Sequence, residues 1–164
     1  MEQNREMPVP RATPRDFFLH LLLFIALYIS VISFIMLIWQ YVNVLLPDPL
    51  TSDYYSAQSA YSGIRWSISM LVIFFPVFIG LSWYMDKLDM ANPERRKFRS
   101  KKWLTYFTLF VAALTIIVDL VTLIYNLLSG ELTLNFAIKV LAVLFAAVLV
   151  FGYYFWDLKK KGEE

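Results

Sequence analysis

Residues 105–128 read TYFTLFVAALTIIVDLVTLIYNLL, a stretch long and apolar enough to cross a lipid bilayer as a helix. Three other stretches share this character, so we predict spans over about 17–46, 64–84, 103–128 and 132–156. The predicted fold class is therefore all-α: a polytopic membrane protein with four transmembrane helices.

The composition of the chain supports this prediction. The sequence has 164 residues, of which 59% are hydrophobic and 18% aromatic. A soluble domain of this length exposes too much of its surface to hide so many apolar side chains. We expect residues 1–15 to be a mobile cytoplasmic tail, 16–158 the transmembrane domain and 159–164 a second cytoplasmic tail. The link at 129–131 is so short that helices three and four should form a tight antiparallel hairpin, and Pro76 should kink helix two.

The positive charges are unevenly distributed. Thirteen of the 15 Lys and Arg residues lie in the two tails and in the link between helices two and three, and the connections at 47–63 and 129–131 hold none. Cytoplasmic loops carry such an excess, so we expect both termini at the cytoplasmic side of the inner (plasma) membrane. The basic link is interpreted as an orientation signal that rests against anionic lipid. Its basic cluster comprises Arg95, Arg96, Lys97, Arg99, Lys101 and Lys102.

One face of the third span carries only small or polar residues. At alternating three- and four-residue spacing this polar seam consists of Thr105, Thr108, Ala112, Thr115, Asp119, Thr122 and Asn126. Such a face suits close helix packing, with hydroxyl groups bonded across the contact or to preceding carbonyls of the same helix. The alternative is that the seam lines water, as in a pore. The threonines favour packing.

Asp119 is the costly member of the seam, because a carboxylate inside a span needs a partner, a proton or water. Lys139 lies as far after the turn near Ser129 as Asp119 lies before it, so a hairpin places the two at similar depth. One interpretation is a structural ion pair between Asp119 and Lys139. The other is that one or both face an aqueous cavity and contact an ion or a ligand.

Other polar residues gather in the predicted outer half of the spans, and the inner halves show no comparable set. They are Gln40, Asn43, Arg65, Asn126 and Asn135, with Glu131 at the hairpin. A set drawn from all four helices suggests a polar vestibule open to the outside. Against this, Arg65 is shallow enough to reach the lipid headgroups, and Gln40 and Asn43 fit the end of a helix.

The sequence lacks the residues that several kinds of site require. The chain has no cysteine, which excludes disulfides and thiolate metal sites, and one histidine, His20, cannot supply two axial haem ligands. We found no catalytic motif and no glycine-rich phosphate loop. We therefore expect a protein that is not an enzyme, needs no cofactor or metal and binds no nucleic acid, with a packing or interfacial role for His20.

A set of short strings resembles a known family. These strings are LLPDP, GIRWSIS, FPVF, NPERR, WLTYFTLFVAALT, DLVTLIYNLLSGELTL and GYYFWDL. Over about residues 15–158 the chain is similar to a family of prokaryotic four-helix membrane proteins catalogued as a domain of unknown function. The resemblance implies a bacterial or archaeal membrane protein of this topology. The shared pattern includes Asp119, Glu131 and Lys139, and it implies no activity.

The functional hypothesis at this point is a homo-oligomer in which the polar seam contributes to a pathway for monovalent or divalent cations. Asp119 would attract the cation, and Lys139 would tune or neutralise Asp119. Neutral oxygens, a mouth carboxylate and flanking polar groups would come from Thr115, Thr122, Asn126, Glu131, Gln40 and Arg65. The alternative is a non-conducting sensor, accessory or scaffold subunit with a structural Asp119–Lys139 pair.

Overall fold

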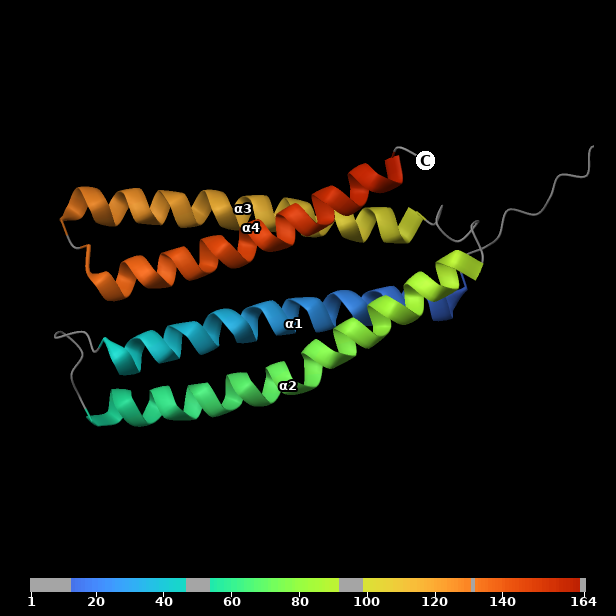
Figure 1. The fold of residues 1–164 in the computed structure, drawn as a ribbon. Helices are drawn as coiled ribbons and strands as arrows, with labels where there is room; N and C mark the ends of the chain where they lie inside the picture. Colours follow the sequence, from blue (N-terminus) through green and yellow to red (C-terminus); the bar gives the residue numbers. More distant parts are fainter. Residues whose placement is uncertain (1–12, 47–53, 92–98, 131, 163–164) are drawn as a thin grey trace, which may run out of the picture.

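The structure is a computed structural model that describes residues 13–46, 54–91, 99–130 and 132–162. Four helices occupy these residues (Figure 1): α1 (Pro14–Leu45), α2 (Tyr54–Ala91), α3 (Arg99–Ser129) and α4 (Leu134–Gly162). Each is long and apolar enough to cross a membrane. The predicted all-α, four-span fold class is confirmed, and the apolar helices indicate a multi-pass protein of a lipid bilayer.

Local sequence signals explain where α1 begins and where α3 ends. Thr13 caps α1 in an extended conformation, Pro14 follows in the first turn, and the Thr13 hydroxyl donates to Asp16 Oδ2 at 2.6 Å. After α3, Gly130 has a φ of 71°, in the left-handed region that favours glycine, and its N–H donates to the carbonyl of Leu127 at 3.3 Å. This turn lets α4 run back against α3, so the predicted tight hairpin is confirmed.

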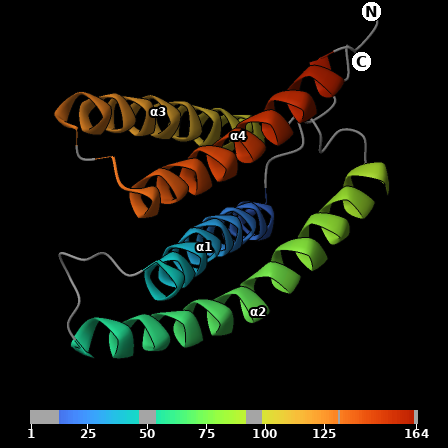
Figure 2. The ribbon, with the colours of Figure 1, turned by 60° about the vertical axis from the view of Figure 1, so that its left-hand side comes forward.

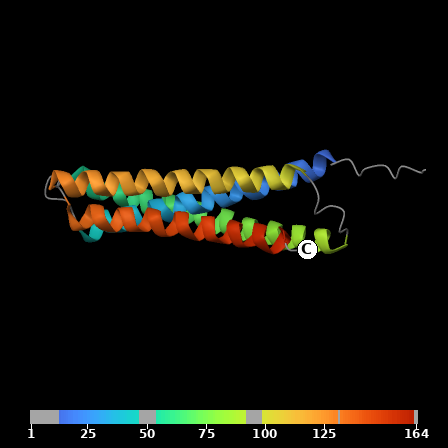
Figure 3. The ribbon, with the colours of Figure 1, turned by 90° about the horizontal axis from the view of Figure 1, so that it is seen from above.

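The four helices are arranged around α1. Along its length α1 packs against α2 on one flank and against α4 on the other, while α3 lies mainly on α4 (Figures 1 and 2). Among the described residues, the backbone of α2 comes close to that of α1 alone. The helix axes run roughly alongside one another (Figure 3). We call the end where α1 and α3 begin and α2 and α4 end the terminal end, and the opposite end the hairpin end.

Small residues bring α1 and α2 together. Ala26, Ser30 and Ser33 are buried on α1 at the three- and four-residue spacing of one helix face, and the Ser30 hydroxyl donates to the carbonyl of Ala26 at 2.7 Å. Farther along, a methyl group added to Gly63 of α2 would stand 2.8 Å from Gln40 Nε2. The absence of a side chain at Gly63 therefore permits the close approach of the two helices.

The hydrophobic core lies in the terminal half of the molecule. Phe24 and Leu27 of α1 are buried there with Tyr154 of α4, and the rings of Phe24 and Tyr154 stack with centroids 5.7 Å apart. Partly buried side chains from every helix surround them: Tyr28, Val31, Phe78, Leu104, Leu109 and Val150. All four helices meet at this core, so it fixes the geometry of the terminal end.

Pro76 lies inside α2, where it cannot donate a backbone hydrogen bond. Figure 1 shows that α2 changes direction near its middle, as the sequence predicts. After the bend, α2 runs toward the side on which α4 lies, and Phe78 reaches the core.

Candidate functional site

The terminal half of the polar seam packs inside the molecule. Thr105, Thr108 and Ala112 are buried, and Thr108 is 1% exposed. The hydroxyl groups of Thr108 and of Tyr28 on α1 lie 2.9 Å apart, and either can donate. This part of the seam therefore joins α3 to α1, as the packing interpretation requires.

The hairpin half of the seam bonds to its own helix. The hydroxyl groups of Thr115 and Thr122 each donate to the carbonyl four residues earlier, at 2.8 Å in both cases. Asn126 Nδ2 donates to the carbonyl of Thr122 at 2.9 Å. The two hydroxyl hydrogens and one amide hydrogen are therefore bonded inside α3 and not to another helix.

Asp119 and Lys139 have different surroundings. The Asp119 Oδ2 atom is buried and makes no hydrogen bond. Lys139 Nζ lies 6.0 Å from the ring centroid of Trp39 on α1, whose Nε1–H donates to the Lys139 carbonyl at 3.4 Å. The structure shows no ion pair between the described side chains of Asp119 and Lys139.

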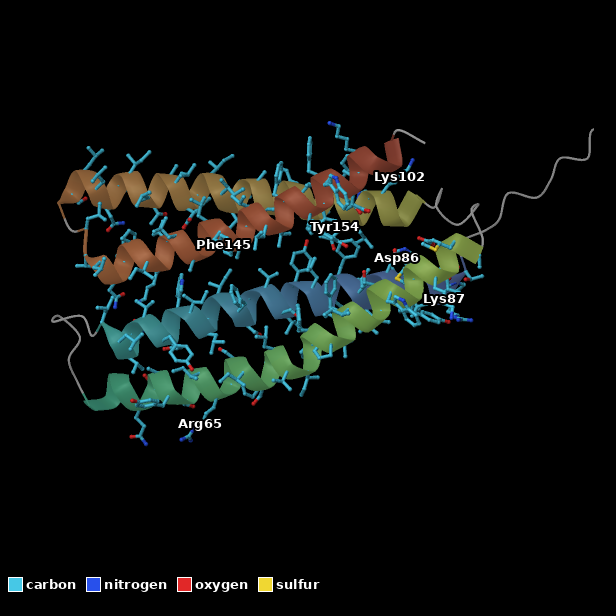
Figure 4. All side chains as sticks on the ribbon, viewed as in Figure 1. Arg65, Asp86, Lys87, Lys102, Phe145 and Tyr154 are labelled. Atoms are coloured by element: carbon cyan, nitrogen blue, oxygen red, sulfur yellow. The ribbon has the colours of Figure 1, made fainter. Side chains whose placement is uncertain are left out.

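The remaining residues of the predicted vestibule lie apart. Gln40 packs toward Gly63 of α2, and its Oε1 accepts from Asn43 at 3.3 Å. Asn135 donates to the carbonyl of Leu46 at 2.7 Å and so ties α4 to the end of α1. Arg65 is exposed and extends from α2 on the side away from α1 (Figure 4). The described contacts of these side chains are therefore with different partners.

The basic cluster is described only in part. Lys102, in the first turns of α3, is exposed. Glu131 and the cluster residues Arg95, Arg96 and Lys97 lie outside the described residues, as do the side chains of Arg99 and Lys101.

Polar side chains from all four helices line one cavity of about 80 Å³ at the terminal end. We call this cavity the terminal pocket. Its polar lining consists of His20 of α1, Ser82 and Asp86 of α2, Thr105 of α3, and Tyr153, Tyr154 and Asp157 of α4. From the sequence, no comparable polar set is expected in these halves of the spans. This expectation is wrong, because polar residues near the terminal end of all four helices meet in the pocket.

The imidazole of His20 has a fixed orientation in this pocket. The side chain is buried, and its Nδ1 lies 2.7 Å from the carbonyl oxygen of Asp16. A carbonyl oxygen only accepts, so Nδ1 carries the hydrogen of this bond. The Nε2 edge is then the edge of the ring that can take up or release a proton.

An apolar groove runs into the terminal pocket. Two cavities of about 450 and 340 Å³ lie over α1, between α2 and α4, and share the side chains of Leu27, Phe78, Leu149 and Val150. We call their union the α2–α4 groove. Toward the hairpin end its walls include Phe34, Leu71 and Phe75, and toward the terminal end Ser82, Trp83, Asp86, Tyr153 and Tyr154.

The groove and the terminal pocket together form a site with two chemical characters. Both volumes of the groove fall within the roughly 300–1,000 Å³ range of small-molecule sites. The groove and the pocket share four polar side chains, Ser82, Asp86, Tyr153 and Tyr154, so the apolar groove ends at a carboxylate and three hydroxyl groups. Among the described residues no group of three His, Asp or Glu side chains is placed to hold a metal ion. The site therefore suits an amphiphilic molecule with a long apolar part.

Sequence reasoning missed the acidic residues of this site. The topology argument counts Lys and Arg near the span ends and gives little weight to Asp and Glu. One signal was present: Trp83 precedes Asp86 by three residues, and Tyr154 precedes Asp157 by the same spacing. One helical turn thus places an aromatic ring beside a carboxylate at the same end of α2 and α4.

Comparison with known proteins gives one match. No curated protein and no solved structure matches the chain. Residues 16–154 match the model of a protein family described as Domain of unknown function (DUF5671). The match covers most of the sequence and includes α1, α2, α3 and most of α4. This four-helix membrane chain therefore belongs to the DUF5671 family.

Proposed function

We propose that this protein is a non-conducting binding module of the membrane that holds an amphiphilic molecule in the α2–α4 groove. The observation that carries the proposal is the continuity of the groove with the terminal pocket, which share the side chains of Ser82, Asp86, Tyr153 and Tyr154. An alkyl chain would lie along Leu27, Phe78 and the α4 side chains, and a polar head would lie at the pocket.

The helix arrangement supports access from the bilayer. Because α2 comes close to α1 alone among the described helices, no backbone closes the space between α2 and α4 from the lipid side. Exposed apolar side chains flank this space on both helices, including Phe75 and Ile79 on α2 and Leu149 on α4. A molecule dissolved in the bilayer would reach the groove sideways, without passing through water. The role is binding and not catalysis, in line with the absence of catalytic motifs from the sequence.

Displacement of a fluorescent alkyl probe tests this function. The protein would be reconstituted in nanodiscs, and a dansyl-labelled alkyl chain would be followed by energy transfer from the tryptophans. Val150→Phe narrows the groove, since Val150 lines both of its cavities, and we expect it to weaken binding by about tenfold or more. Val118→Phe makes the same exchange on an exposed position of α3 and should leave binding unchanged. Equal binding by the two variants would contradict the proposal.

The cation pathway is a second candidate, favoured by the buried Oδ2 of Asp119, which makes no hydrogen bond. A cavity of about 270 Å³ between α1, α3 and α4 includes Thr108 and Thr115 in its lining, and a homo-oligomer could extend it along the seam. Cation flux into proteoliposomes that is lost in Asp119→Asn would favour this candidate. No flux from well-folded wild-type protein, over varied ions and potentials, would remove it.

We also propose that the terminal end faces the cytoplasm and that the membrane is the inner (plasma) membrane. The support is the concentration of Lys and Arg in the tails and in the link between α2 and α3. In this orientation the groove opens toward the cytoplasmic leaflet, where the terminal pocket lies at headgroup depth.

A further inference from the structure

Building on the proposed function, we infer that the ligand of the α2–α4 groove is a single-chain organic cation, an alkylammonium whose charged head lies at Asp86. The inference specifies the chemical class of the ligand. It follows from the charge and the aromatic character of the place where the groove meets the terminal pocket.

Asp86 occupies the junction of the two cavities. It lines both the groove and the terminal pocket, and its carboxylate is exposed to them. Figure 4 shows Asp86 on the side of α2 that faces Tyr154, whereas Lys87 points to the opposite side. A head group at the end of the groove therefore meets the carboxylate and not the neighbouring ammonium.

The nearby cations with described contacts have partners of their own. Lys87 Nζ lies 5.3 Å from the centroid of the Trp83 ring, and Arg15 Nη2 donates to the Tyr84 hydroxyl at 2.8 Å. Among the described residues no Lys or Arg lines the groove or the terminal pocket, whereas Asp86 lines both. His20 is the one described basic group in that lining, and its buried ring is held at Nδ1 by the Asp16 carbonyl. The electrostatics favour a positive head over a phosphate or a carboxylate.

Aromatic rings complete the site. Tyr153 and Tyr154 line the groove beside Asp86, and their rings stand at 90° with centroids 5.2 Å apart. Rings at such angles present π faces in more than one direction, and a π face attracts an ammonium ion within about 6 Å of its centroid. A substituted ammonium needs no array of hydrogen-bond acceptors, so one carboxylate and several rings satisfy it better than they satisfy a metal ion.

Three displacers with the same alkyl chain separate charge from apolar binding. Dodecyltrimethylammonium, dodecanol and dodecyl sulfate would compete with the dansyl alkyl probe for protein in nanodiscs of uncharged lipid. We expect the cation to displace the probe at a concentration about tenfold lower than that of dodecanol, and dodecyl sulfate to be the weakest. In Asp86→Asn the advantage of the cation over dodecanol should fall several-fold, to the part that the tyrosine rings supply, with the displacement by dodecanol unchanged. Asp119→Asn, which removes a carboxylate outside the site, should keep the preference of the wild type.

The outcomes distinguish this inference from the function on which it rests. If the three compounds displace the probe equally, or if Asp86→Asn retains the full wild-type preference for the cation, the inference is wrong and the groove still binds alkyl chains. If no alkyl probe binds to folded wild-type protein, the proposed function itself is wrong. Because Asp86 is exposed and has no described hydrogen bond, its replacement by Asn should not disturb the fold. A circular dichroism spectrum of the variant checks this point.

Discussion

A hydroxyl pair contributes to the contact between the third helix and the first. Thr108 is almost fully buried, and its hydroxyl lies 2.9 Å from that of Tyr28. Thr108→Val keeps the shape of the side chain and leaves the Tyr28 hydroxyl without this partner. We expect a loss of about 0.5–1.5 kcal/mol in the free energy of unfolding, measured by denaturation in mixed micelles.

Thr122→Val is the matched control for that measurement. Thr122 is exposed, and its hydroxyl donates to the carbonyl of Val118 in the same helix. The substitution should therefore change stability by less than about 0.5 kcal/mol. If both variants lose the same stability, the contact between Thr108 and Tyr28 contributes nothing specific. Addition of Tyr28→Phe to each variant completes a double-mutant cycle that isolates the pair.

The same seam shows how far residue patterns can be interpreted. Three- and four-residue spacing identified which side chains of α3 share a face, and Thr108 and Ala112 on that face are buried. The spacing could not identify the neighbour of each residue, because that depends on the order of the helices. Asp119 and Lys139 were matched by depth along the hairpin, whereas Lys139 reaches Trp39 on α1. The depth of a side chain in the bundle follows from counting residues along its helix. The direction in which that side chain points around the helix axis depends on how the helices pack.

At the scale of the element, the bend of α2 positions one wall of the groove. Pro76 lies between Phe75, which lines the cavity nearer the hairpin end, and Phe78, which lines both cavities. Pro76→Ala restores a backbone hydrogen bond and should straighten α2, so that its terminal half moves away from α4. We expect a longer distance between α2 and α4 at the terminal end and alkyl-probe binding weakened several-fold.

Spin labels can measure this movement directly. The chain has no cysteine, so cysteines placed at Met90 and Lys159 give one defined pair of labels, both on exposed positions. Pulsed electron paramagnetic resonance would compare the label distance in the parent and in Pro76→Ala. Pro14→Ala, a proline exchange in the first turn of α1, should leave the distance unchanged. An unchanged distance in Pro76→Ala would show that packing on α1, and not the proline, bends the helix.

The existence of the four helices was predictable from the sequence, whereas their lengths were less predictable. Apolar runs identify the part of a helix that lies in hydrocarbon, because there every backbone group must be bonded within the chain. The run at 64–84 marks the second span, but α2 extends over Tyr54–Ala91, about 57 Å at 1.5 Å per residue. Polar residues continue the helix beyond the roughly 30 Å apolar layer, where no hydropathy signal distinguishes a helix from a loop. The acidic residues of the terminal pocket lie in such extensions, which is why they were missed.

At the scale of the whole molecule, the direction of the bundle in the membrane can be measured. A cysteine in place of Ser129 lies at the hairpin end, and one in place of Met90 lies at the terminal end; both positions are exposed. We expect a membrane-impermeant maleimide to label the cysteine at position 129 in intact cells. The cysteine at position 90 should react only after the membrane is opened. The reverse pattern would overturn the proposed orientation, and labelling of both in intact cells would contradict a fixed one.

The central place of α1 has a consequence for biosynthesis. Since α1 precedes α2, α3 and α4 in the chain, the helix that touches each of the others is already in the membrane when they arrive. When α2 is inserted, α1, its one close neighbour among the described helices, is already in the membrane. The third and fourth helices can join later as a hairpin. The helices can thus assemble in the order in which they are synthesised, and none has to remain unpacked until a later helix is made. A chain whose first helix were moved to its end would lose this advantage although its finished contacts were the same.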